Sequence, residues 1–168
     1  MISVATIDDV KELNILVNSA YRGESSKIGW TTEADLLGGI RIDEARLIEM
    51  INKPGCDVLI FKEDNQIKGC VQLEAHGDKL YLGMLTVKPN LQGKGLGKKF
   101  LAAAEDHARK KNCHKIYMTV LTARIELINW YLKHGYYNSG IRKPFPENDP
   151  KFGLPKTHLE FVILEKNI

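Results

Sequence analysis

The chain has 168 residues, of which 43% are hydrophobic and 27% are charged, which predicts one soluble domain spanning residues 1–168. Its net charge of +3, from 24 basic and 21 acidic residues, is too small to indicate a nucleic-acid partner or a membrane surface. Apolar runs of membrane-spanning length are absent, and residues 1–9 lack a signal-peptide pattern, so we expect a cytoplasmic protein.

Hydrophobic periodicity predicts helices in the first third of the chain. Thr6 precedes apolar residues at helical spacing and can cap the first helix. In chain order, the sequence predicts a helix at 7–21, a loop at 21–30, a short helical stretch from Thr31 or Thr32 to Leu37, and a helix that Asp43 caps and Pro54-Gly55 ends.

Strand patterns dominate the middle of the chain. Three consecutive antiparallel strands are predicted at 57–62, 66–75 and 79–87. An amphipathic helix, 97–112, follows and leads to a strand at 115–121, which should run parallel to 79–87 because a helix crosses between them. A helix at 125–134 and final strands at 138–141 and 159–165 complete the list. This order predicts an α/β fold, a central mixed sheet with helices on both faces.

The three cysteines form no recognisable site. Cys56, Cys70 and Cys113 are widely spaced, without a Cys-x-x-Cys pair or a His/Cys cluster at zinc spacing. We therefore expect a reducing compartment and no metal, and we interpret Cys70 and Cys113, which lie in apolar surroundings, as packed thiols.

A loop rich in glycine and lysine follows the strand 79–87. Gly93, Gly95 and Gly97 allow the backbone to curl so that several N–H groups point the same way. The first turn of the next helix adds unpaired donors and a positive dipole end, and Lys94 and Lys98 add charge. Such a loop favours a phosphate or pyrophosphate.

Two common phosphate-binding patterns are not met. A Walker loop requires glycine five positions after Gly93, and a dinucleotide fingerprint requires glycine three positions after Gly95; both positions are Lys98. The pattern Gln-x-x-Gly-x-Gly is met by Gln92, Gly95 and Gly97.

With this motif the chain resembles the GNAT superfamily of N-acetyltransferases. The coenzyme A motif of that family, Gln/Arg-x-x-Gly-x-Gly/Ala, follows a strand ending in Leu-x-Val-x-Pro, which Leu85, Val87 and Pro89 match. Downstream, Tyr131 to Tyr136 match an aromatic residue, three spacers and Gly-Tyr. The resemblance covers essentially the whole chain, and it implies the GNAT fold with acetyl-CoA as co-substrate.

The resemblance also implies where acetyl-CoA binds. The strands 79–87 and 115–121 would splay around the thioester, with the backbone of Leu85 and Val87 on the pantetheine arm and an N–H near Leu85 serving the oxyanion. Many relatives carry asparagine seven positions before the tyrosine, where this chain has Arg124. The expected cofactor-binding residues are Leu85, Thr86, Val87, Gln92, Gly93, Lys94, Gly95, Leu96, Gly97, Lys98, Arg124 and Asn129.

Acyl transfer to an amine needs a proton acceptor for the amine and a proton donor for the thiolate. Tyr131 matches the donor position of the family, and its phenol is protonated at neutral pH. The competing interpretation is a core aromatic at helical spacing. Glu74 is the expected base, while Glu24, Glu33, Asp35 or a water chain stay open as alternatives.

The acceptor side is expected in two loops rich in functional groups. Tyr21 and Trp30 could wall a pocket, Glu24 and Glu33 could bind a cationic amine, and Phe145 could project into the acceptor groove. The alternative is that the aromatics cover the core and the carboxylates are solvated. The two loops suggest an enclosed site and therefore a primary amine of a small molecule.

Other functions stay open at this point. The chain could be a catalytically silent coenzyme A sensor, a protein-lysine or N-terminal acetyltransferase, or a nucleotide-binding enzyme. Both a monomer and a homodimer are compatible with the sequence.

Overall fold

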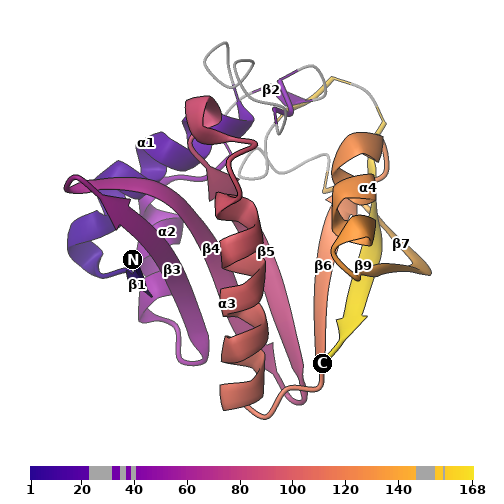
Figure 1. The fold of residues 1–168 in the computed structure, drawn as a ribbon. Helices are drawn as coiled ribbons and strands as arrows, with labels where there is room; N and C mark the ends of the chain where they lie inside the picture. The colour runs from indigo at the N-terminus through magenta and orange to yellow at the C-terminus, as the bar shows by residue number, and fades with distance from the viewer. Residues whose placement is uncertain (23–31, 35–36, 39–40, 147–153, 157) are drawn as a thin grey trace.

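The computed structural model describes residues 1–22, 32–34, 37–38, 41–146, 154–156 and 158–168 (Figure 1). Its elements in chain order are β1 (Ile2–Val4), η1 (Ile7–Asp9), α1 (Val10–Tyr21), β2 (Leu37–Gly38), α2 (Glu44–Asn52), β3 (Cys56–Glu63), β4 (Gln66–His76), β5 (Lys79–Val87), η3 (Pro89–Leu91), α3 (Leu96–Lys110), β6 (Lys115–Leu121), α4 (Ile125–Lys133), β7 (Tyr137–Pro144), β8 (Leu154–Pro155) and β9 (Glu160–Asn167).

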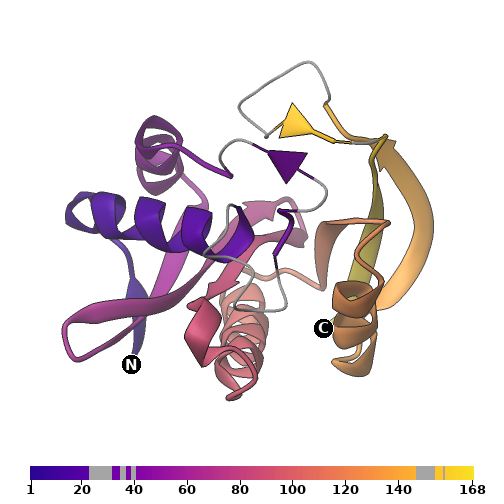
Figure 2. The same cartoon turned by 90° about the horizontal axis from the view of Figure 1, so that it is seen from above.

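A mixed sheet of seven strands forms the centre of the structure, in the order β1-β3-β4-β5-β6-β9-β7. The helices α1 and α2 lie on one face, and α3 and α4 lie on the other (Figure 2). Neighbouring strands are antiparallel except β5 and β6, which the crossover through α3 makes parallel. The predicted fold class is therefore confirmed.

Local sequence signals account for several element boundaries. The carboxylate of Asp43 caps α2 by accepting a hydrogen bond from the backbone N–H of Arg46 at 2.8 Å. Asp64 and Asn65 take φ angles of 55° and 58° in the tight turn between β3 and β4, a conformation that these residue types tolerate. Gly135, with a φ of 92°, follows the end of α4 as the left-handed residue that terminates many helices.

Two strand pairings were not predicted. β1 adds to the sheet beside β3, and β2 pairs with β8 so that Leu37 lies opposite Pro155. The helical stretch predicted from Thr31 or Thr32 to Leu37 is wrong, because the described residues 32–34 form no helix and Leu37 begins β2. A helix this short is marginal by itself, so pairing with a distant segment decides the conformation.

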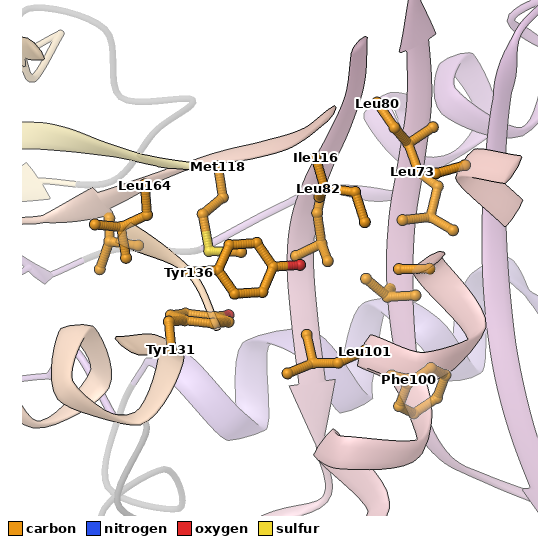
Figure 3. Packing of buried hydrophobic residues seen from close by; sticks show 14 of the residues in the cluster. Leu73, Leu80, Leu82, Phe100, Leu101, Ile116, Met118, Tyr131, Tyr136 and Leu164 are labelled. Atoms are coloured by element: carbon orange, nitrogen blue, oxygen red, sulfur yellow. The ribbon is translucent and has the colours of Figure 1, made fainter. Parts of the chain in front are cut away.

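Hydrophobic clusters fill both faces of the sheet. Beneath α1 and α2 the cluster includes Leu13, Leu47 and Ile60. On the opposite face, beneath α3 and α4, the cluster includes the residues labelled in Figure 3, which are Leu73, Leu80, Leu82, Phe100, Leu101, Ile116, Met118, Tyr131, Tyr136 and Leu164. The central strands are thus fixed from both sides, which makes them a rigid frame for a site.

Candidate active site

An extra residue in β5 changes the face that the end of this strand presents. The pairing of β4 with β5 shifts between Cys70 and Gln72. Opposite this shift, Met84 takes a φ of 53° and packs into the cluster beneath α1 and α2. Because side chains alternate along a strand, the bulge turns Leu85 and Val87 toward the other cluster, beneath α3 and α4.

The sheet opens between β5 and β6 (Figure 1). The two strands pair only from Lys79 to Tyr81 on β5 and from Lys115 to Tyr117 on β6. Beyond these residues both strands continue, and β6 stays paired with β9 along its length. The splay expected between these two strands is therefore present.

Two cavities meet at the opening. The larger cavity, of about 520 Å³, lies between β4, β5 and β6 on the side of α1 and α2. The smaller cavity, of about 380 Å³, lies between the Gly-rich loop, the first turn of α3 and α4. Leu85, Leu127 and Tyr131 line both cavities, so these three residues mark the passage between them.

The Gly-rich loop forms one end of the smaller cavity. Gly93 and Gly95 take φ angles of 85° and 86°, which glycine adopts without strain. Gly95 is also the N-cap of α3, so the first N–H groups of this helix point to the cavity end without intrahelical partners. Of the predicted cofactor residues, those lining the smaller cavity are Leu85, Val87, Gln92, Gly93, Gly95, Leu96, Gly97 and Lys98. The arrangement of backbone donors and a lysine fits a pyrophosphate.

One face of α4 forms the opposite wall of the smaller cavity. Leu127, Trp130 and His134 line it together with Tyr131, at helical spacing. Trp130 packs on Gly97, where a Cβ would lie 3.2 Å from the indole. The first three of these residues were not predicted, although helical spacing from Tyr131 would have identified them.

The remaining predicted cofactor residues lie outside this wall. Asn129 is exposed on α4, Lys94 is exposed in the loop, and Arg124 is buried before α4; none of the three lines the smaller cavity. Thr86 is buried, and its hydroxyl donates a hydrogen bond to the carbonyl of Met84 at 2.9 Å. Thr86 therefore supports the bulge with its side chain.

Tyr131 is buried at the junction of the cavities. Its ring makes an edge contact with Trp130, 5.1 Å between ring centres. It makes a second edge contact with Tyr136, 5.7 Å between ring centres (Figure 3). Burial raises the pKa of the Tyr131 phenol well above its usual value, so the hydroxyl is protonated at neutral pH. Tyr131 thus belongs to the core cluster and also reaches both cavities, which combines the two interpretations of this residue.

Side chains from outside β5 hold its carbonyl groups near the bulge. The hydroxyl of Tyr21 donates a hydrogen bond to the carbonyl of Leu85, and Gln92 Nε2 donates to the carbonyl of Val87 at 3.0 Å. Burial raises the pKa of Tyr21 to about 12, which keeps this donor protonated. Tyr21 is buried behind the larger cavity, and the guanidinium of Arg41 lies 5.6 Å from the centre of its ring.

Glu33 lies between two buried arginines. Its Oε1 accepts hydrogen bonds from Arg22 Nη2 at 2.9 Å and from Arg22 Nε at 3.2 Å, and its Oε2 lies 3.4 Å from Arg124 Nη1. Only 4% of the Arg22 side chain and 8% of the Arg124 side chain are exposed. The carboxylate expected to bind an amine is therefore already paired with two cations.

Glu74 lines the larger cavity near the point where β5 and β6 still pair. Its Oε1 lies 2.5 Å from Lys53 Nζ and 3.4 Å from His76 Nε2. The hydrogen bond from Lys53 raises the pKa of that ammonium group. On β5, Tyr81 is opposite Glu74, and its ring lies 5.4 Å from that of Tyr117. Glu74 thus lines the larger cavity, with a cation on one of its oxygens.

Phe145 also lines the larger cavity. It is buried in a small cluster with Leu121, Leu159 and Phe161, and its ring centre lies 5.4 Å from that of Phe161. The predicted acceptor residues Glu24 and Trp30 lie outside the described residues.

The described part of the chain contains no group of three or more His, Cys, Asp or Glu residues placed to hold a metal ion. Its helices are all too short or too polar to cross a membrane. Cys56, Cys70 and Cys113 are free and buried, and burial raises the pKa of Cys70 to about 12. The interpretation of Cys70 and Cys113 as packed thiols is confirmed, and Cys56 is buried as well.

Comparisons with known proteins point to one family. A family model described as "Acetyltransferase (GNAT) family" matches residues 26–136. Among curated proteins, an acetyltransferase of Agrobacterium fabrum is 27% identical over 93 residues, which cover 55% of this chain and 66% of that protein.

Solved structures share the fold over almost the whole chain. A ribosomal-protein-alanine N-acetyltransferase from Brucella melitensis matches with a TM-score of 0.73 and 20% identity, covering 100% of this chain and 99% of that one. An N-acetyltransferase from Staphylococcus aureus gives 0.74 at 15% identity, with 99% and 96% covered. A protein from Salmonella typhimurium solved with its cofactor acetyl-CoA gives 0.70 at 19% identity, with 99% and 92% covered.

Proposed function

The chain belongs to the GNAT family of acetyltransferases, a family of acetyl-CoA-dependent enzymes, and we propose that it acetylates the primary amine of a small molecule by direct attack in a ternary complex. The observation that carries this proposal is the position of Tyr131, which lines both cavities where β5 and β6 separate. The smaller cavity would take acetyl-CoA, and the larger cavity would take the amine.

Acetyl-CoA binding is supported by the chemistry of the smaller cavity. Backbone N–H groups at Gly95 and the first turn of α3, with Lys98, would hold the pyrophosphate. The apolar side chains of Leu85, Val87 and Trp130 would cover the pantetheine arm. This arrangement directs the thioester toward Tyr131 at the other end of the cavity.

The reaction needs two proton movements. The amine nitrogen forms a bond to the thioester carbon and gives up a proton, for which Glu74 on the wall of the larger cavity, directly or through water, is our proposed acceptor. The carbon–sulfur bond then breaks, and the hydroxyl of Tyr131 gives its proton to the departing thiolate. The high pKa of Tyr131 keeps that proton available over the whole neutral range.

A small acceptor is supported by contacts between the two segments that flank the larger cavity. β2 and β8 pair with each other, and Lys156 Nζ donates to the carbonyl of Ala34 at 2.7 Å. These contacts join the segment after α1 to the segment after β7, on which Phe145 lies. A joined pair of segments suits an enclosed pocket better than an open groove for a peptide.

A thiol-release assay tests the proposal. Purified protein with acetyl-CoA should release coenzyme A when a small primary amine is added from a panel that also includes lysine-containing and N-terminal peptides. Turnover of peptides alone would move the acceptor to the protein class. Tight acetyl-CoA binding without turnover of any amine would favour the sensor function.

A further inference from the structure

The proposed function does not specify which chemical groups the acceptor carries besides its amine, but the residues that line the larger cavity indicate one of them. We infer that the acceptor amine bears an oxyanion group, a carboxylate or a phosphate, which Arg41 binds in the larger cavity next to the buried pair Arg22 and Arg124. This inference rests on the proposed function, because it assigns the acceptor of the same site.

Cations outnumber carboxylates around the larger cavity. The positively charged residues lining it are Arg22, Arg41, Arg46, Lys53 and Lys143, and the carboxylates lining it are Glu33 and Glu74. Both carboxylates are already in ion pairs, Glu33 with two arginines and Glu74 with a lysine. Among the described residues, the lining cations without a carboxylate partner are Arg41 and Lys143, which gives the described lining a surplus of positive charge.

Two guanidinium groups lack the partners that such groups normally have. In the described part of the chain, Arg41 lies in no ion pair with a carboxylate, and its guanidinium contacts the face of Tyr21. Nη2 of Arg124 is buried and has no hydrogen-bond partner among the described residues, although more than nine-tenths of this residue is buried. Arg41 lines the larger cavity and Arg124 does not, so a ligand oxyanion in this cavity would pair with Arg41 and add negative charge near the buried Arg124.

The position of these groups places the oxyanion close to the reacting end of the acceptor. Arg41 lies over Tyr21, whose hydroxyl binds the carbonyl of Leu85, and Leu85 lines the passage between the cavities. Arg124 precedes α4, the helix that carries Tyr131. The oxyanion and the amine of the acceptor should therefore be separated by only a few bonds.

The surplus charge also favours the reactive form of the amine. Nearby cations lower the pKa of an ammonium group, so the acceptor loses its proton more readily in this cavity than in water. A diamine or polyamine would meet repulsion at both ends. An acceptor with an oxyanion offsets the repulsion at one end and presents a neutral amine at the other.

Matched acceptor pairs test the inference in the full chain. With acetyl-CoA, kcat/KM is measured for β-alanine against β-alaninamide, for phosphoethanolamine against ethanolamine, and for a diamine. The wild type should prefer the anionic member of at least one pair by about tenfold or more, which is the strength expected of a charge-assisted hydrogen bond. Which pair shows the preference distinguishes a carboxylate from a phosphate.

The variant Arg41→Gln should remove about tenfold of that preference, and Arg41→Lys should restore part of it. Arg109→Gln serves as the matched control, because Arg109 is exposed on α3 and pairs only with the exposed Asp106 at 3.2 Å among the described residues. Arg109→Gln should keep the wild-type preference. Equal or better turnover of the neutral members by the wild type would overturn the inference and leave the proposed acetyl transfer intact.

A calorimetric titration keeps the two proposals separable. β-Alanine and phosphoethanolamine are titrated into wild type and Arg41→Gln in the presence of coenzyme A. Binding of either to the wild type but not to Arg41→Gln, without turnover of any amine, would support the oxyanion site and reject acetyl transfer. Absence of both binding and turnover would overturn the inference together with the function on which it rests.

Discussion

The hydroxyl of Tyr21, the last residue of α1, donates a hydrogen bond to the carbonyl of Leu85 next to the bulge in β5. This bond joins the N-terminal helix to the strand residue that lies between the two cavities. Because the donor is buried, its removal would leave the carbonyl of Leu85 without this hydrogen bond.

Tyr21→Phe should therefore lower the free energy of unfolding by about 1–2 kcal/mol and raise the KM for acetyl-CoA. Urea denaturation and thiol-release kinetics measure the two effects. Tyr137→Phe is the control, since the exposed hydroxyl of Tyr137 lies 3.2 Å from Glu165 and its loss should cost less than about 0.5 kcal/mol. Equal costs for the two variants would contradict this role of Tyr21.

Tyr131→Phe should reduce kcat by about 10²-fold or more while the dissociation constant of acetyl-CoA stays close to that of wild type. The reason is that phenylalanine fills the same space and offers no proton to the thiolate. The neighbouring Tyr136→Phe is a matched control, because its buried hydroxyl has no hydrogen-bond partner among the described residues. Tyr136→Phe should retain kcat, and an unchanged kcat in Tyr131→Phe would exclude this residue as the proton donor.

Gly95→Ala should destabilise the fold by about 1–2 kcal/mol, because a φ of 86° is strained for alanine. It should also raise the KM for acetyl-CoA several-fold by shifting the donors at the start of α3. Gly77→Ala carries a comparable strain, with a φ of 63°, in the turn between β4 and β5 and away from the smaller cavity. That control should lose similar stability and keep the acetyl-CoA KM; a raised KM in both variants would point to general destabilisation.

Stability should fall as the pH rises from about 9 to about 12. Burial raises the pKa of Cys70 from 9.0 to about 12, so the unfolded chain releases this proton before the folded chain does. The stabilisation is complete below pH 9.0 and is lost as the pH rises through the folded value, by about 1.4 kcal/mol per pH unit for one group. Tyr21 adds the same effect between its usual value of 10.0 and about 12.

Cys70→Ala isolates the contribution of the thiol. The variant loses packing and is less stable at every pH, but its free energy of unfolding should fall less steeply between pH 9 and 11 than that of wild type. Urea titrations at several pH values measure the slope. Identical slopes for the two proteins would show that Cys70 does not titrate with this linkage.

Sequence patterns predicted the regular part of the fold well, because its signals are local. The cap at Asp43, the tight connection between the strands 57–62 and 66–75 and the end of the helix 125–134 each involve neighbours in the chain, and the structure bears out all three. The parallel pairing of β5 with β6 followed from the crossover helix alone. Membership in the acetyltransferase family, expected from Gln92, Gly95 and Gly97, was confirmed by the family match.

What could not be predicted depends on contacts between distant residues. A methionine gives no local signal for a positive φ, so the bulge at Met84 follows from how β4 and β5 pack. Glu33 stood out in the sequence as a free carboxylate in a loop, but Arg124, 91 positions away, neutralises it together with Arg22. The surplus positive charge of the larger cavity could not be predicted for the same reason, because its lining residues come from distant parts of the chain.

The early separation of β5 and β6 also bears on how such an enzyme can change. Because only three residue pairs join the two halves of the sheet here, the donor and the acceptor proposed above would approach from opposite faces and meet through the gap. Substitutions on the side of α1 and α2 could then alter which amine is accepted without disturbing the smaller cavity, where acetyl-CoA would bind. The gap would thus separate the acetyl-CoA site, which members of the family share, from the acceptor site, which differs among them.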